Sequence, residues 1–322
     1  MKTSDHRSPD LVTFGEAMGL VTADGTGPLQ FARQFHLSIG GAECNVAVGA
    51  ARLGTSVTWF GRLGRDAVGD LIAYRLAAEG IDAIITRDDS FTGLMIKHQR
   101  AAGTTSVDYH RRGSAGSRLR PADIPATAIA AARVLHLTGI TAALSPEALD
   151  TVMKAVEIAH GSATTVSFDV NYRSKLWSPA ASRPILAEIA RKADIVFAGP
   201  AEAALVLGAD PDICRSKLVS GLHELGPRQV ILKDGIRGYS ALIDDEIHDG
   251  PALRVHQVDP VGAGDAFVAG YLTDYILDRP GHQCLATATA SGAYAVTVPG
   301  DCDGLPTRSD LATLDSGQDV SR

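Results

Sequence analysis

Short apolar runs alternate with helical patterns along almost the whole of this 322-residue chain. LVTFGE (residues 11–16) is the first such run, and four later runs end in Gly, Asp or Asn: VLHLTG (134–139), TVSFDVN (165–171), DIVFAG (194–199) and QVILKDG (229–235). A strand that is buried on both faces of a sheet reads as such a continuous apolar run. The alternation therefore predicts βαβ units, with a mostly parallel sheet covered by helices on both faces.

Two segments break this rhythm. Residues 20–38 and 93–112 mix polar and apolar side chains at period two, which is typical of half-buried strands. Because both lie between units of the parallel sheet, they could form a small β excursion above its carboxyl edge. They could equally be ordinary edge strands, and the pattern alone leaves the two alternatives open.

Composition narrows the class of protein. Hydrophobic residues make up 45% of the chain and charged residues 21%, which is typical of a globular protein and excludes wholesale disorder. The 30 basic and 37 acidic side chains give a net charge of −7, so the chain lacks the basic surplus of a nucleic-acid or anionic-membrane binder. An anionic substrate would have to meet a local cluster of positive charge.

Targeting and cysteine patterns indicate a cytoplasmic location. The first ten residues lack the apolar core of a signal peptide, and no apolar stretch reaches the length of a membrane span. The four cysteines are scattered without metal-ligand spacing, which favours reduced thiols. We expect the polar segment 314–322 to form a disordered tail.

The sharpest chemical motif is DPVGAGDAFVAGYL, residues 259–272, in which a glycine-rich turn runs into a helix. Free amides of Gly262, Ala263 and Gly264 at the helix start would bind an anion, helped by the helix dipole. A carboxylate placed there, Asp265, can accept a proton from an attacking hydroxyl. The alternative is a plain glycine turn with an acidic residue in the first helical turn.

This motif resembles the C-terminal signature of the ribokinase-like (PfkB) sugar kinases. IGGAECNVAVGAARLG (39–54) and GRLGRDAVGD (61–70) resemble the N-terminal signature of the same family, in the same order. The resemblance spans roughly residues 10–310. It implies a single kinase domain over residues 1–322, folded as a three-layer α/β sandwich with a mostly parallel central sheet. The segments 20–38 and 93–112 would then form a small β-sheet lid.

The resemblance also implies roles for individual residues. Asp265 would be the general base that activates a sugar hydroxyl for attack on the γ-phosphate of ATP, and the Gly262–Gly264 turn would be the anion hole. Four residues at the start of the N-terminal signature would contact the sugar: Gly40, Gly41, Ala42 and Asn45. The two glycines could also serve simply as a tight turn before a helix.

Resemblance places the nucleotide beside ILKDGIRGYS, residues 231–240. The implied nucleotide contacts are Lys233, Gly235, Gly238, Gly262, Gly264 and Thr289. Glu202 would organise Mg²⁺ through water, although Gly199 and Thr289 stand where the family usually has a polar residue and an Asn. A glycine turn and a solvated helix-start glutamate are the alternatives. Whether a monovalent cation takes part is left open.

Three segments point to the substrate: VDYHRRGSAGSRL (107–119), HLTGITAALSPE (136–147) and FDVNYRSKLWS (168–178). Together they resemble 2-keto-3-deoxygluconate kinases, although Met95 stands where close relatives have a tyrosine. By this resemblance Arg111 and Arg173 hold the sugar acid and Tyr109 donates from the lid, and a planar guanidinium suits a carboxylate. Alternatively, Arg111 is a solvated lid charge and Arg173 pairs with Asp169.

Three hypotheses about function follow. The first is ATP-dependent phosphorylation of the terminal hydroxyl of 2-keto-3-deoxygluconate. The second keeps the chemistry with another acceptor, namely 2-keto-3-deoxygalactonate, fructose, ribose or a nucleoside. The third is a catalytically weak sugar-binding sensor on a kinase scaffold. The expected partners are therefore a sugar acid and ATP, not nucleic acid or membrane, and a homo-oligomer formed through the lid is left open.

Overall fold

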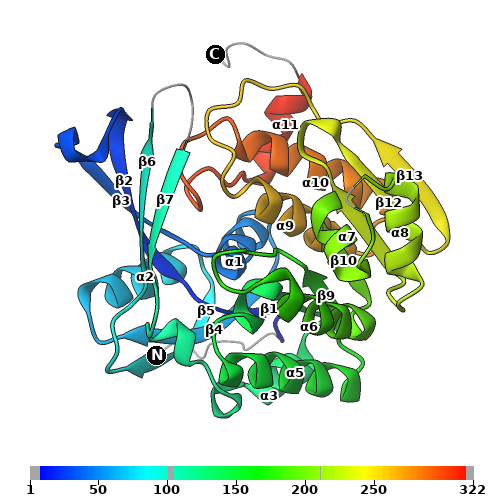
Figure 1. Cartoon of the computed structure of the whole chain (residues 1–322), viewed down its shortest axis with the longest axis horizontal. Coiled ribbons are helices and arrows are strands. Elements are labelled where there is room, and N and C mark those ends of the chain that lie inside the picture. Colours follow the sequence, from blue (N-terminus) through cyan, green and yellow to red (C-terminus); the bar gives the residue numbers. More distant parts are fainter. Residues whose placement is uncertain (1–7, 101–104, 211, 317–322) are drawn as a thin grey trace.

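A nine-stranded sheet forms the centre of the computed structural model, which describes residues 8–100, 105–210 and 212–316 (Figure 1). Its strand order is β13-β12-β11-β10-β9-β8-β1-β4-β5, and all neighbours from β11 to β5 are parallel. The strands are β1 (Leu11–Phe14), β4 (Val57–Gly64), β5 (Asp82–Asp88), β8 (Val134–Thr138), β9 (Thr165–Asp169), β10 (Ile195–Ala198), β11 (Gln229–Lys233), β12 (Tyr239–Ile243) and β13 (Glu246–Gly250). The prediction of a mostly parallel sheet is confirmed.

Helices cover both faces of this sheet. Successive residues of a strand point to opposite faces, so Ile195 and Phe197 join one core cluster while Val196 and Ala198 join the other. The first cluster packs under α1 (Ala42–Arg52), α2 (Ala67–Ala78), α9 (Ala263–Ile276) and α10 (Gly281–Ala295). The second packs under α3 (Ala126–Ala131), α5 (Pro146–Gly161), α6 (Pro179–Lys192), α7 (Pro200–Leu207) and α8 (Arg215–His223). The predicted three-layer sandwich is confirmed.

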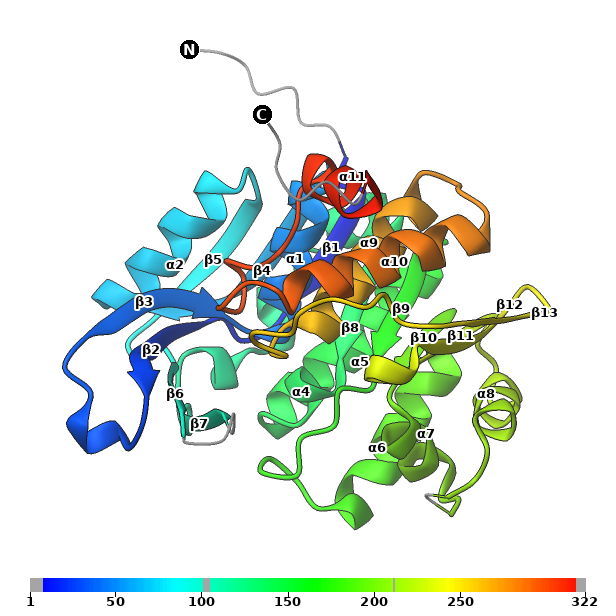
Figure 2. The same ribbon diagram turned by 90° about the horizontal axis from the view of Figure 1, so that it is seen from above.

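A separate four-stranded sheet, the lid, has the order β3-β2-β6-β7. Its strands are β2 (Met18–Thr26), β3 (Phe35–Gly40), β6 (Leu94–Gln99) and β7 (Thr105–His110). β2 pairs with β6 in parallel, and the other two pairings are antiparallel. Since none of these strands joins the central sheet, the alternative of ordinary edge strands is wrong. In Figure 2, β3 lies beside the loop that follows α10, to which Ser38 of β3 is hydrogen-bonded.

Short helices complete the element order: α4 (Gly139–Ala142), α11 (Arg308–Ser316), and the 3₁₀ turns η1 (Leu29–Phe31), η3 (Gly116–Arg118), η4 (Pro121–Asp123) and η5 (Gly235–Arg237). Helix α11 corrects the expected tail, because it runs to Ser316 and Leu314 packs on Leu53, Ala290 and Leu311. The rest of that expected tail, 317–322, lies outside the described residues. None of the described helices combines the length and apolar character that a membrane crossing requires.

The antiparallel β12–β13 hairpin was not predicted. Its turn residues Asp244 and Asp245 adopt φ values of 48° and 69°, a left-handed conformation that aspartate tolerates better than most residues. Leucine and isoleucine in β12 read as one more apolar run, so the sequence pattern did not distinguish this hairpin from a βα unit.

Candidate active site

A cleft of about 1130 Å³ opens between the lid and the central domain. The lid contributes wall residues from β2, β6 and β7, and the central domain contributes the start of α1, the segment after β9, the turn before α9 and the loop after α10. Of the residues that the sequence singled out, the cleft is lined by Gly41, Ala42, Asn45, Tyr109, Arg111, Arg173, Gly262 and Asp265. One large cleft with convergent polar groups is the ordinary form of a small-molecule site.

The floor of this cleft is formed by Asn45, Asp265 and Asp301. Asp265 lies in the first turn of α9, whose N-cap Gly262 has φ 81°, a conformation that favours glycine. The Asn45 amide donates from Nδ2 to Asp265 Oδ2 at 2.7 Å and to Asp301 Oδ1 at 2.8 Å. Asn45 Oδ1 in turn accepts a hydrogen bond from Cys302 Sγ at 2.9 Å. One buried amide therefore fixes two carboxylates.

Burial raises the pKa values of both carboxylates of the floor. Burial, and then the charge of Asp301, raise the pKa of Asp265 to about 7. Burial also raises the pKa of Asp301 to about 6, against the opposing charge of Lys97. A carboxylate with a pKa near neutrality can both accept and release a proton at physiological pH. The floor thus has the electrostatics of a general-base site.

The turn before α1 shows why two glycines stand there. Gly41 caps α1 with φ 134°, and a Cβ atom at this position would collide with the backbone oxygen of Glu16. A Cβ at Gly40 would collide with Asp301 Oδ2. The tight-turn alternative is therefore correct for these glycines. Gly41 nevertheless lines the cleft, so it can also contact a ligand.

Lys233 and Asp169 form an ion pair of 2.6 Å beside the turn that begins α9. Lys233 Nζ lies 3.5 Å from where a Cβ of Gly264 would stand, so its ammonium group is close to the start of α9. Asp169 Oδ1 is buried without a hydrogen-bond partner among the described residues. Because Asp169 pairs with Lys233, the alternative in which it pairs with Arg173 is wrong.

Glu202 is held by backbone amides at the start of α7. Its Oε2 accepts a hydrogen bond from Gly199 N at 2.6 Å, and its Oε1 accepts one from Tyr172 N at 2.9 Å. Burial, followed by the Asp169 charge, raises the pKa of Glu202. The alternative of a solvated helix-start glutamate is therefore wrong. Gly199 needs no polar side chain here because its backbone N–H makes the contact.

The other residues assigned to the nucleotide have local structural partners. Gly235 and Gly238 close the turn between β11 and β12, where Gly238 N donates to Gly235 O at 3.0 Å and Asp234 N donates to Gly238 O at 2.8 Å. Thr289 Oγ1 donates to Leu285 O at 2.7 Å within α10. None of the three lines the cleft described above, and their contact with a nucleotide stays a prediction.

Arg111 is tied to a buried carboxylate at the base of the lid. Its Nε donates to Glu16 Oε2 at 2.6 Å, and Ser114 Oγ donates to the other oxygen of Glu16. Glu16 is 2% exposed, so this pair is not a solvated surface contact. The alternative of a solvated lid charge is therefore wrong for Arg111, whose charge is matched before any ligand enters.

The rim of the cleft, formed by Tyr109, Arg173 and Lys175, carries exposed positive charge, and Lys175 Nζ donates to Val107 O at 3.3 Å. Tyr109 is 42% exposed, and Lys175 Nζ lies 5.7 Å from the centre of its ring. Arg173 is exposed and forms no hydrogen bond or ion pair with any part of the chain that the structure describes. The rim can therefore offer two cations and a phenol to an entering anion.

Comparison with known proteins identifies the family of this chain. Residues 8–308 match the profile of the pfkB family carbohydrate kinases. The chain belongs to the PfkB family. It is 35% identical over 320 residues to a 2-dehydro-3-deoxygluconokinase of Bacillus subtilis, covering 96% of both chains. It is 32% identical over 295 residues to a 2-dehydro-3-deoxygalactonokinase of Haloferax volcanii, covering 91% of this chain and 92% of the relative.

Comparison with solved structures supports the same family fold. The fructokinase of Xylella fastidiosa with bound ATP superposes with a TM-score of 0.82 at 26% identity, covering 96% of this chain and 98% of that one. Family and fold together make this protein a sugar kinase, that is, a phosphotransferase with an alcohol group as acceptor. The predicted family and reaction class are confirmed.

Three charged residues of this cleft were missed by sequence reasoning: Glu16, Lys97 and Asp301. Asp301 lies in PGDCDG, residues 299–304, directly after the helix that packs on α9. A Pro-Gly-Asp turn at that place was the available signal. Glu16 and Lys97 gave none, because only the folded chain shows that their charges are buried in the cleft wall.

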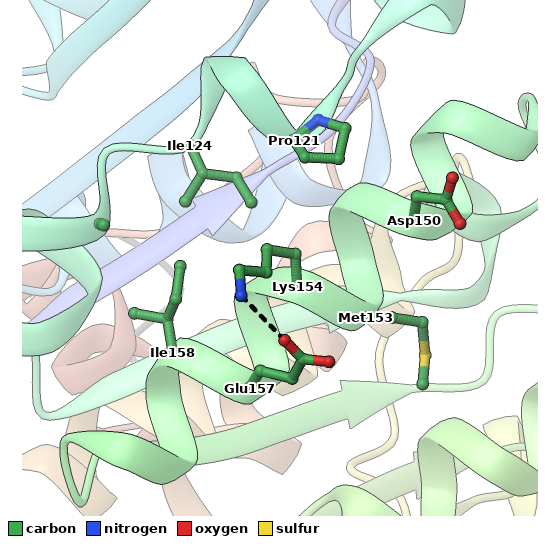
Figure 3. A pocket seen from close by; sticks show the side chains of 8 residues that line it. Pro121, Ile124, Asp150, Met153, Lys154, Glu157 and Ile158 are labelled. Atoms are coloured by element: carbon green, nitrogen blue, oxygen red, sulfur yellow. Dashed lines mark hydrogen bonds and ion pairs between the residues drawn. The ribbon is translucent and has the colours of Figure 1, made fainter.

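A second hollow, of about 510 Å³, lies on the outer surface of α5 and is lined by fewer residues than the cleft (Figure 3). Its lining is Pro121, Ile124, Ala126, Asp150, Met153, Lys154, Glu157 and Ile158. The charged side chains there are exposed, and Lys154 pairs with Glu157 at 3.0 Å along the helix. The charged residues of this outer hollow are therefore solvated, unlike the buried carboxylates of the cleft.

Proposed function

We propose that this kinase phosphorylates the terminal hydroxyl of 2-keto-3-deoxygluconate with ATP, using Asp265 as the general base. The observation that carries the proposal is the position of Asp265: a buried carboxylate with a pKa near 7, at the start of a helix, facing the cleft. Asn45 holds its Oδ2 at 2.7 Å, so Oδ1 is the oxygen available to an acceptor hydroxyl.

The chemistry follows from the groups around Asp265. As the acceptor oxygen attacks the γ-phosphorus, its proton passes to Asp265 and the bond to the β-phosphate oxygen breaks. Negative charge on the transferred group is met by the amides of Ala263 and Gly264 and by the dipole of α9. The ammonium group of Lys233, which is paired with Asp169, lies beside Gly264 and can also donate to the phosphoryl group. These groups are in place before substrate binds, so little reorganisation is needed.

ATP is proposed as the phosphoryl donor because the Xylella relative holds it. Among the described residues, no three metal-binding side chains cluster together, so Mg²⁺ would be held mainly by phosphates and water. The unpartnered Asp169 Oδ1 and the nearby Glu202 fit such a role. Bound Mg²⁺ would neutralise phosphate charge.

An acidic acceptor is proposed from the charges of the rim. Arg173 and Lys175 form no ion pair among the described residues, in a protein whose net charge is −7. The charge of Arg173 acts on Asp301 of the floor, but the exposed guanidinium can still bind the carboxylate of an acidic acceptor. The galactonate epimer carries the same carboxylate, and the Haloferax relative makes it the second candidate. A sensor without catalysis is disfavoured because binding alone requires no base.

The test is an ADP-release assay with ATP and Mg²⁺, comparing 2-keto-3-deoxygluconate with its galactonate epimer, fructose, ribose and adenosine. We expect turnover with the keto-deoxy acids only, and the faster epimer identifies the acceptor. Fast turnover of fructose or ribose would overturn the role of Arg173 while leaving that of Asp265 intact. Sugar binding without any turnover would favour the sensor.

A further inference from the structure

Lys97 of the lid reaches the turn that begins α9. Its ammonium group forms an ion pair with Asp259, and the two side chains are only 6% and 8% exposed. Asp259 Oδ1 accepts a hydrogen bond from Val261 N at 3.2 Å, inside the glycine-rich turn. Asp259 Oδ2 also accepts one from Gly300 N at 3.2 Å, next to Asp301. One carboxylate thus holds both the turn and the loop that carries Asp301.

A buried carboxylate of this kind depends on its cation. Removing one partner of a buried ion pair leaves an uncompensated charge, which is strongly unfavourable. Lys97 is the one basic side chain that pairs with Asp259 within the described part of the chain. If the ammonium group were lost, water or an ion would have to reach Asp259, and the amides of the turn would move with it.

The two lid cations that form ion pairs with buried carboxylates, Arg111 and Lys97, differ in what they connect. Arg111 pairs with Glu16, which lies at the base of the lid itself, between β1 and β2. Lys97 instead crosses from the lid to residues that precede α9. A second tie runs the same way, since Ser38 Oγ of β3 donates to Asp303 Oδ2 at 2.5 Å. The lid is therefore joined to the catalytic turn and its neighbouring loop at two places.

We propose that Lys97 is a positioning residue for phosphoryl transfer: its ammonium group is the internal cation that holds the turn Asp259–Gly262 and the loop at Gly300 in their working arrangement. The inference rests on the proposed function only in that this turn binds the transferred phosphoryl group. It makes the position of the lid a determinant of how the turn is aligned. Lys97, which lines the cleft, acts through its ion pair with Asp259, and its charge also acts on Asp301.

The test is Lys97→Ala, assayed with whichever sugar the wild-type enzyme turns over fastest. We expect kcat to fall about 100-fold, as when a donor of an anion hole is lost, with a smaller change in the KM of the sugar. The shortened side chain leaves room beside an unpaired carboxylate. Ammonium or methylammonium should therefore restore kcat by about tenfold or more, whereas tetramethylammonium is too large to do so.

Two controls keep the test specific. The wild-type enzyme at equal ionic strength reports any general salt effect. The double variant Lys97→Ala/Asp259→Asn lacks the Asp259 carboxylate but keeps Asp301, so ammonium that acts through Asp259 should not restore its activity. Each of four results would overturn the proposal. Two concern the single variant without added cation: an unchanged kcat in Lys97→Ala, or a rise in the KM of the sugar alone. Two concern rescue: a low kcat in folded Lys97→Ala that ammonium leaves low, or equal rescue of the double variant.

Folding is checked by circular dichroism and the thermal midpoint. If Lys97→Ala does not fold, Lys97→Met keeps the apolar stem of the side chain, and the proposal then requires a low kcat with the sugar KM retained. Unchanged kcat in Lys97→Met overturns it. Asp265→Asn is measured in parallel and tests the general base separately. If Asp265→Asn keeps full turnover while ammonium rescues Lys97→Ala, Asp265 is not the base and the role of Lys97 still holds.

Discussion

On the floor of the cleft, Asp265 and Asp301 are buried, crowded and held by one amide, whereas at its rim Arg173 and Lys175 are exposed and adaptable. Burial raises the pKa values of both carboxylates of the floor, and the charge of Asp301 raises that of Asp265 further. The rim keeps its cations in water until a ligand arrives. This difference implies that the floor governs the rate of the chemical step and the rim governs the affinity for the acceptor.

The largest effect that tests this division is expected from Asp265→Asn. The amide cannot take a proton from the acceptor, so kcat should fall by about 10²- to 10⁴-fold. Sugar KM should stay within a few-fold of wild type, because the rim is untouched. Steady-state kinetics with the best acceptor measure both. Near-normal turnover would place the base elsewhere.

At the rim, Arg173→Ala should raise the KM of an acidic sugar by about 10- to 100-fold, the loss expected for hydrogen bonds to a charged group. Its kcat should change little. Arg191→Ala is the matched control, because Arg191 is an exposed arginine at the far end of α6 that pairs with Glu188. A drop in kcat at unchanged KM would break the division between floor and rim.

A smaller effect should appear in the pH profile of Asp301→Asn. The Asp301 charge raises the pKa of Asp265, so removing it lowers that pKa and leaves more of the base ionised in weak acid. The acid limb of kcat/KM should therefore shift to lower pH, with about a few-fold gain at pH 6 relative to pH 8. Asp303→Asn, in the same loop but paired with Arg75, is the control. A shift to higher pH would contradict the assignment.

The smallest effect is expected at the outer hollow of Figure 3. Lys154→Met removes one partner of an exposed pair on α5, which should change the free energy of unfolding by no more than about 0.5 kcal/mol. Denaturant unfolding and steady-state kinetics measure the two effects. A changed kcat would show that this surface communicates with the cleft after all.

Local patterns predicted the elements better than the contacts between them. Period-two alternation indicated the lid, and the glycine-rich turn indicated where α9 begins and where Asp265 stands. Asp301 and Lys97 escaped prediction because their significance depends on burial beside residues far away in the chain. Arg111 shows the same limit, since its sequence neighbours gave no sign that Glu16 already balances its charge. The role of a charged side chain in the site can be inferred only once the structure shows which charge it pairs with.

The hydrogen bond from Asn45 to Asp301 joins residues 256 positions apart. Arg52 at the end of α1 also holds the loop that carries Asp301, because it donates to the backbone oxygens of Cys302 and Leu305 at 3.0 and 2.7 Å. A growing chain therefore carries Asn45 and Arg52 long before it carries the residues that they hold. Because contacts so distant along the chain form late in folding, the floor of the cleft is complete only after residues 301–305 have been made.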